Sequence, residues 1–188
     1  EQANQTQSTV SPDWHLLYHL ALDHMARGKN REAESCFCES IRQKENAWSR
    51  YGLASLLCLE GREYERAVSW MEMGLMERAG DLSYVKEGFR VLARCGGYDA
   101  LIRVYGQLPE NVASESRVVL EYITALYQTG RYKEAYALLT AEGGLVVADL
   151  REGENSIVCL WRELRRALHM PEEEVPHVFD FNAEGRQS

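Results

Sequence analysis

A repeat of about 34 residues is the feature that most constrains how this chain can fold. One anchor of the repeat is a small or apolar residue that recurs every 34 positions, at Ala33, Ala67, Leu101 and Ala135. Three residues earlier, a second anchor keeps the same interval, at Asn30, Tyr64, Tyr98 and Tyr132. Such a period is typical of helix pairs that stack side by side, because one pair cannot bury its own apolar face. We therefore predict an all-α, right-handed superhelical solenoid of about four helix pairs.

Each position that recurs at the repeat interval has a physical role in this prediction. A glycine precedes every second helix and is expected to end the first helix in a left-handed conformation, at Gly28, Gly61, Gly96 and Gly130. Four residues after the anchor, a large side chain is expected to fill the space between pairs, at Phe37, Met71, Tyr105 and Leu139. Seven residues after the anchor, the first two repeats have a small residue, but the last two have Leu108 and Glu142. We therefore expect the last two pairs to pack differently.

The helix boundaries follow from this register and from capping signals. Ser11 is expected to cap the first helix, with Pro12 at its first position. Gly61 lies six residues before its anchor, where the other glycines lie five before theirs, so we expect a bulged turn near Arg62. The expected pairs cover residues 12–27 with 30–44, 46–60 with 63–78, 81–95 with 98–108, and 114–129 with 132–141, and the loop 109–113 is the longest break between them.

The chain is expected to change character after the fourth pair. Gly143 and Gly144 break the helical pattern, and Asn155 or Ser156 is expected to cap a helix over 157–168. That helix has one apolar face and is expected to close the array with charged residues outside, at Arg162, Glu163, Arg165 and Arg166. The expected organisation is a flexible linker over 1–10, four pairs over 11–142, a connecting segment with a capping helix over 143–170, and an extended acidic and aromatic tail over 171–188.

Composition excludes several classes of function. The net charge of -8 argues against nucleic-acid binding, which needs a cationic surface. No apolar run is long enough to cross a membrane. The odd count of 5 cysteines favours free thiols in a reducing compartment, so we predict a cytoplasmic protein. The chain starts without Met and without the pattern of a signal peptide, and we expect it to be a fragment of a longer protein.

From Trp14 to Ala141, the Gly-x-Tyr-x-x-Ala pattern and its period resemble the tetratricopeptide repeat family. The usual Trp and small residue of the family's first helix are only partly present. The resemblance implies a concave groove, lined by the first helix of each pair, that binds extended protein segments. A narrower resemblance covers residues 147–156, Leu160-Trp161 and Asp180-Phe181. It is to the C-terminal end of long bacterial proteins of unknown function, in which a β-rich region similar to carbohydrate-active enzymes precedes the repeats.

The register assigns a set of residues to this groove. They are His15, Tyr18, Trp48, Tyr51, Lys86, Arg90, Arg117 and Tyr127, with Leu22, Ser55, Arg94 and Thr124 between them. Aromatic residues therefore gather at one end and basic residues at the other. A basic cluster in an acidic protein suggests an anion site. The alternative is a solvated face whose charges pair with nearby acids, and the Asn-containing clamp of the family is not matched.

Catalysis and metal binding have weaker support in the sequence. His15, His19 and Asp23 share one helix face at spacings of four, but a metal site needs more ligands than one helix edge supplies. The cysteines lack a partner pattern for nucleophilic catalysis. We predict no enzyme activity, no cofactor and no metal. An enzyme or metal protein built on His15, His19 and Asp23 remains the third hypothesis.

The favoured hypothesis is an interaction or scaffolding module that binds a protein or peptide partner. In a more specific form of this hypothesis, the chain's own tail docks in the groove of the same copy or of a neighbouring copy. The hypothesis is therefore compatible with an oligomer. Lys86, Arg90 and Arg117 would then pair with the tail glutamates Glu172, Glu173 and Glu174, and the phenylalanines Phe179 and Phe181 would dock beside them. The second hypothesis is an accessory C-terminal domain of a bacterial carbohydrate-processing protein, in contact with an upstream domain.

Overall fold

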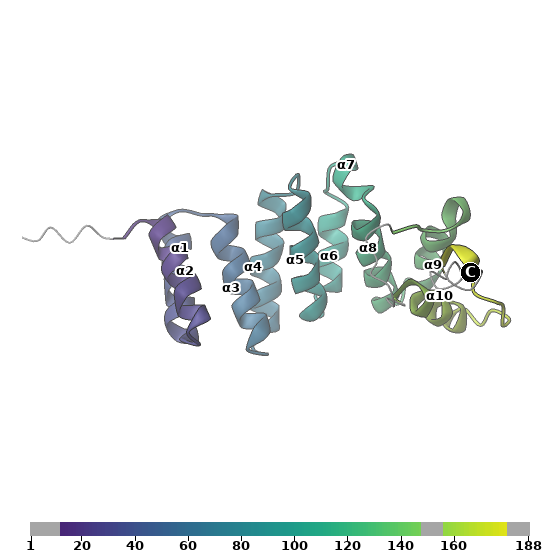
Figure 1. The fold of residues 1–188 in the computed structure, drawn as a ribbon, viewed down its shortest axis with the longest axis horizontal. Helices are drawn as coiled ribbons and strands as arrows, with labels where there is room; N and C mark the ends of the chain where they lie inside the picture. The colour runs from purple at the N-terminus through teal and green to yellow at the C-terminus, as the bar shows by residue number, and fades with distance from the viewer. Residues whose placement is uncertain (1–11, 148–155, 180–188) are drawn as a thin grey trace, which may run out of the picture.

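The protein is a row of helices stacked side by side along one long axis (Figure 1). The computed structural model describes residues 12–147 and 156–179. The helix pairs are α1 (Trp14–Ala26) with α2 (Asn30–Gln43), α3 (Ala47–Leu59) with α4 (Tyr64–Glu77), α5 (Leu82–Arg94) with α6 (Tyr98–Tyr105), and α8 (Ser116–Gln128) with α9 (Tyr132–Thr140). The remaining described elements are α7 (Glu110–Ala113), η1 (Ala141–Gly143), α10 (Ser156–Ala167) and η2 (His177–Phe179).

The repeat register predicted from the sequence is confirmed. Each second helix begins at its predicted anchor, at Asn30, Tyr64, Tyr98 and Tyr132. The four positions three residues later are fully buried, at Ala33, Ala67, Leu101 and Ala135. The glycine after each first helix is left-handed, with φ of 69° at Gly28, 66° at Gly61, 70° at Gly96 and 78° at Gly130. Glycine suits these turns because a side chain would strain a positive φ.

Several boundaries differ from the predicted ones. Asp13, rather than Ser11, caps α1: its carboxylate accepts a hydrogen bond from the Leu16 N–H at 2.8 Å. Ser11 itself lies outside the described residues. The predicted loop over 109–113 contains the short helix α7, which forms because Val112 is buried beside the third pair.

The second helices of the last two pairs are shorter than those of the first two. They have 8 residues in α6 and 9 in α9, against 14 in both α2 and α4. α6 therefore ends before Leu108, and α9 ends before the seventh position of its repeat. In α2 and α4 that position is a buried Ser40 or Gly74, which lets the next helix approach closely. The last two pairs therefore pack differently, as expected, because α6 and α9 end before the large residue at the seventh position.

Neighbouring repeats fit together by size complementarity. Where the first helix of a pair has a small residue, the preceding second helix supplies a large one: Phe37 fills the space at Gly52, and Leu75 fills the space at Gly88. Where the first helix has a large residue, the small residue is on the preceding helix, and Tyr84 packs on Gly74. The Tyr84 hydroxyl reaches over that glycine to donate a 2.7 Å hydrogen bond to the Ala47 carbonyl. These contacts make the junctions as tight as a protein core.

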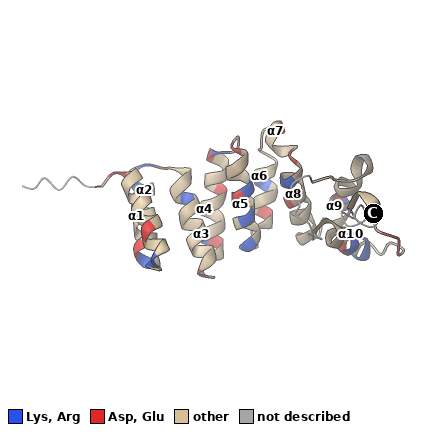
Figure 2. Cartoon of the chain, viewed as in Figure 1, with Lys and Arg blue, Asp and Glu red and all other residues tan. Residues whose placement is uncertain are grey.

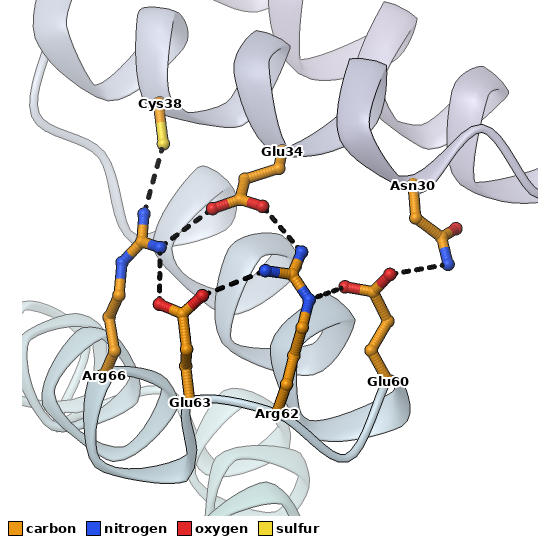
Figure 3. A network of polar contacts seen from close by, with 7 residues as sticks. All are labelled: Asn30, Glu34, Cys38, Glu60, Arg62, Glu63 and Arg66. Atoms are coloured by element: carbon orange, nitrogen blue, oxygen red, sulfur yellow. Dashed lines mark hydrogen bonds and ion pairs between the residues drawn. The ribbon is translucent and has the colours of Figure 1, made fainter.

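The extra residue in the second repeat forms the expected bulged turn. Glu63 is left-handed, with a φ of 52°, which is unusual for a residue with a side chain. The turn presents Arg62 to the first repeat, where it donates to Glu34 of α2 at 2.7 Å (Figure 3). Arg66 of α4 donates to the other oxygen of Glu34 at 2.8 Å. The hydrogen bond from Arg62 is the main reason why the pKa of Glu34 is lowered, and Arg66 adds to it.

The C-terminal part forms a second core against the fourth pair. α10 buries its predicted apolar face, through Ile157, Leu160, Trp161 and Leu164. Arg165 was expected on the outer face, and this is wrong. Its side chain is buried, stacks on Trp161 with 4.8 Å to the ring centroid, and donates to the Pro171 carbonyl and the Tyr136 hydroxyl. Arg165 therefore ties the segment after α10 to α9. The expected cap Asn155 and the linker over 1–10 lie outside the described residues.

Gly52→Ala tests the close contact between the first two repeats. Helix propensity alone would make the variant more stable by roughly 1 kcal/mol. We expect the opposite, a loss of about 1–3 kcal/mol, because the added methyl group would meet the buried Phe37 ring. Urea denaturation followed by circular dichroism measures the free energy of unfolding. Gly80→Ala is the control, since a methyl group there meets open space; equal effects at the two glycines would contradict the packing described here.

Glu34→Gln tests the ionic contact across the same junction. The folded-state pKa of Glu34 lies below its ordinary value of 4.5, so the ion pair stabilises the protein above that pH and is lost as the pH falls through the folded pKa. We expect the variant to be less stable at pH 7 by about 1–2 kcal/mol. The difference from the wild type should narrow as the pH falls below 4.5. Urea titrations at several pH values measure this, with Glu65→Gln on exposed surface as control; a gap that does not depend on pH would refute the assignment.

Candidate functional site

The first helices of the second and third repeats enclose a cavity of about 260 Å³. It is lined by Tyr51, Ser55, Cys58 and Leu59 of α3, and by Glu87, Arg90, Val91 and Arg94 of α5. We call this surface the α3–α5 groove. The Oγ atom of Ser55 is buried and has no hydrogen-bond partner within the described part of the chain. A buried hydroxyl of this kind is available to a polar group that enters the groove.

Most basic side chains near the groove are paired with acidic residues. The sequence alone did not decide between such pairing and an anion site. Lys86 is 3.1 Å from a Glu115 oxygen, and Arg90 is 2.6 Å from a Glu87 oxygen. Figure 2 shows basic and acidic residues intermixed on α5 and the helices beside it. Arg94, at the last turn of α5, is exposed and forms no ion pair with a residue in 12–147 or 156–179. The groove is therefore polar and balanced, with Arg94 as its available positive charge.

Arg117 lies one pair further along, at the start of α8. Its backbone N–H donates to a Glu115 oxygen at 3.0 Å, and that carboxylate caps the helix. Glu115 also holds Lys86, so one acid connects the third and fourth pairs. Lys86 thus takes part in the junction between pairs, and neither Lys86 nor Arg117 lines the α3–α5 groove.

The aromatic residues predicted for the groove fall into two groups. Tyr18 and Tyr51 are close enough for Tyr51 to contribute to the raised pKa of Tyr18, which burial raises most. Trp48 packs edge-on against Tyr84, with 5.5 Å between ring centroids, and lies under Arg78 at 4.8 Å. Trp48 as a whole residue remains 43% exposed, so part of it is open to contact. Tyr51 is the aromatic residue that shares a cavity with Arg90.

Tyr127 and His15 lie at opposite ends of the array. Tyr127 contacts the Tyr132 ring at 5.6 Å between centroids, and its pKa is raised chiefly by burial and further by Glu163 of the capping helix. His15 is exposed and its Nε2 is 3.3 Å from Nε2 of His19. No group of three or more potential metal ligands is found within the described ranges. Of the eight predicted residues, Tyr51 and Arg90 line the same groove.

Four lining residues were not predicted for the groove from the sequence: Cys58, Leu59, Glu87 and Val91. Glu87 was detectable, because it lies three residues before Arg90 on one helix and can therefore pair with it. Leu59 and Val91 carried no such signal, since apolar residues on a repeat helix are normally expected in the core. Leu59 is exposed and Val91 is buried, and their place in the wall of the cavity depends on how far α3 and α5 separate.

The described part of the tail docks at the C-terminal end of the array and not at the groove. Glu173 pairs with Arg165 at 2.7 Å, so the predicted pairing of this glutamate with Lys86, Arg90 or Arg117 is wrong. Phe179 is 1% exposed and belongs to the core cluster of α8, α9 and α10. The reason is that the buried Arg165 needs a carboxylate partner nearby, and the chain leaving α10 supplies it. Phe181 lies outside the described residues.

A larger cavity of about 480 Å³ lies at the end of α10, lined by Trp161, Arg162, Arg165, Arg166, His169 and the segment 170–173. Two of its positive charges have local partners: Arg165 pairs with Glu173, and Arg166 pairs with Glu163. Cations at a helix C-terminus also interact favourably with the helix dipole, so their presence there has a structural explanation.

The arrangement of helices is similar to that of a solved TPR-domain containing protein from Parabacteroides distasonis. The two share 20% sequence identity with a TM-score of 0.56, over 90% of this chain and 29% of that one. The fold is a tetratricopeptide-type solenoid. The chain spans less than a third of the length of that protein.

No family model matches the sequence, and no curated protein is significantly similar to it. Among the described helices, none is long and apolar enough to cross a membrane. The five cysteines are free thiols, as predicted. The residues that carry the second resemblance, apart from Val147, Ser156 and Leu160-Trp161, lie outside the described residues.

Phe179→Ala tests how the tail is held. The ring is fully buried beside Gly144, so its removal should weaken the docking of residues 171–179 by about 3 kcal/mol. Because this segment can open while the repeats stay folded, amide hydrogen exchange is the appropriate measurement. Exchange should accelerate in 171–179 and α10 but not in α1–α6. His177→Ala, at an exposed position of the same turn, is the control; unchanged exchange in the Phe179 variant would show that the tail is held by other contacts.

Proposed function

We propose that the chain is a non-catalytic interaction module and that its α3–α5 groove binds an extended segment of a protein partner. The observation that carries this proposal is the composition of one cavity, which combines an aromatic face, an unbonded hydroxyl and an available cation. Tyr51 supplies a surface for an apolar side chain, and Ser55 supplies a hydrogen bond to a peptide group. Arg94 and the Arg90–Glu87 pair suit a segment with an acidic side chain.

The solenoid supports this proposal by its shape. Stacked helix pairs create an extended surface lined by the first helices, which accommodates a linear segment better than a compact ligand. The tail of the chain does not fill this surface in its described part, because residues 171–179 are held at the other end by Arg165 and Phe179. The proposed partner is therefore another protein or another domain.

The alternative function is an accessory role in a longer carbohydrate-processing protein. Its support is the second sequence resemblance, most of which lies outside the described residues, and no contact described above favours it. The interaction module is therefore the function that the groove supports best.

The test is a selection of random 12-residue peptides on the wild-type protein, followed by affinity measurements on variants. We expect peptides with an acidic residue to be enriched and Arg94→Glu to weaken their binding by about tenfold or more, since a like charge would replace the available cation. Arg31→Glu, an exposed charge reversal on α2, is the matched control and should leave affinity unchanged. Tyr51→Ala should also weaken binding. If no peptide is enriched, or if both charge reversals act equally, the groove is not the binding site.

A further inference from the structure

Two of the five cysteines meet at the junction between the second and third pairs. Cys58 lies in the last turn of α3, is buried, and forms part of the wall of the α3–α5 groove. Cys95 directly follows α5 as its C-cap and is half-buried. Both belong to the core cluster that joins α3 to α5, and Cys95 also packs against the core of the first two pairs. The stacking of α3 and α5 thus makes neighbours of two residues that are far apart in the sequence.

The two thiols are close enough to act on each other. The pKa of the Cys95 thiol is raised to about 12, chiefly by burial and then by hydrogen bonding to Cys58 and by the charge of Cys58. Arg94 acts in the opposite direction as the smallest of these causes. Side chains that already interact need only a small rearrangement to reach the sulfur–sulfur distance of about 2 Å in a disulfide.

Each of the two thiols also borders an open cavity. Cys58 lines the α3–α5 groove, as described above. Cys95 lines a second cavity of about 290 Å³ beside α4 and α6, together with Val68, Gly97 and Arg103. A small reagent can therefore approach the pair from either side of the junction, although both sulfur atoms belong to the core.

The other three cysteines are not arranged in this way. Cys36 and Cys38 are two residues apart on α2, and side chains at that spacing do not face each other on a helix. Burial is the main reason why the pKa of each of these two thiols is raised, and no second thiol contributes to either shift. Cys159 is exposed on α10. The pair that the fold brings together is therefore Cys58 with Cys95.

We propose that Cys58 and Cys95 are a redox pair that a small disulfide such as glutathione disulfide oxidises, and that the new disulfide narrows the α3–α5 groove. The thiolate of one cysteine attacks a sulfur of glutathione disulfide, which forms a mixed disulfide and releases one glutathione thiolate. The thiolate of the other cysteine then attacks the protein sulfur of the mixed disulfide, and the second glutathione leaves. The two cysteine protons pass to the two glutathione thiolates, so the pair loses two electrons and glutathione disulfide gains them.

The effect on the groove follows from the position of the new bond, and this step rests on the proposed function. Leu59 and Arg94 line the groove at the C-terminal ends of α3 and α5. A bond between Cys58 and Cys95 would draw these two ends together and fix their separation. A segment that binds beside Arg94 needs the present width of the groove, so the oxidised chain should bind it more weakly.

The first experiment treats the full chain with glutathione disulfide and digests it with trypsin under non-reducing conditions. We expect mass spectrometry to detect a disulfide-linked pair of peptides, residues 51–62 and 95–103, which dithiothreitol separates. Cys58→Ala and Cys95→Ala should each abolish the linked pair, and the matched control Cys38→Ala should retain it. Absence of the linked pair from the oxidised wild type would overturn the proposal.

The second experiment compares the reduced and oxidised chains with an acidic peptide obtained from the selection described above. Oxidation should weaken binding by about tenfold or more, and dithiothreitol should restore it. Equal affinities would overturn the proposed regulation. An equal loss in oxidised Cys95→Ala would also overturn it, because glutathione attached to Cys58 would then be the cause. A wild type that forms the linked pair but binds no selected peptide in its reduced state would refute the groove function and leave the disulfide established.

Discussion

The structure depends on close approach between each first helix and the second helix before it. A small residue on one of the two helices makes this approach possible at each junction. Gly52 receives Phe37, Gly74 receives Tyr84, and Gly88 receives Leu75. Because each repeat touches mainly its neighbours, these junctions carry the cooperativity of the whole array. A poorly fitting residue at one of them would disturb the spacing of the first helices, and with it the width of the groove.

The groove is a consequence of this spacing. α3 and α5 are separated at their C-terminal ends, where Leu59 and Arg94 line an open cavity, while Tyr84 closes the space at the other end by contact with Trp48 and Tyr51. The aromatic contacts and the cavity therefore lie between the same two helices, α3 and α5. Acidic residues on adjacent positions neutralise most of the basic charge, so that recognition depends on shape, hydrogen bonding and one arginine.

The two ends of the array are finished differently. At the C-terminus, α10 and the segment that follows cover the fourth pair, and the buried Arg165 is satisfied by Tyr136, Pro171 and Glu173. At the other end, α1 presents Leu16 and Leu20 without a covering helix among the described residues.

The sequence by itself determined the repeat, because Gly28 and its equivalents, together with the buried anchors such as Ala33, impose local conformations and sizes that do not depend on distant contacts. It also determined the apolar face of α10, which follows from helical spacing. Only the tertiary structure decided which charges are neutralised: Lys86 meets Glu115, and Glu173 meets Arg165, through contacts between different elements. Only the tertiary structure also placed Tyr51 and Arg90, two of the eight residues predicted for a groove, in the wall of one cavity. Helical register sets the direction of a side chain but not the separation of its helix from the next.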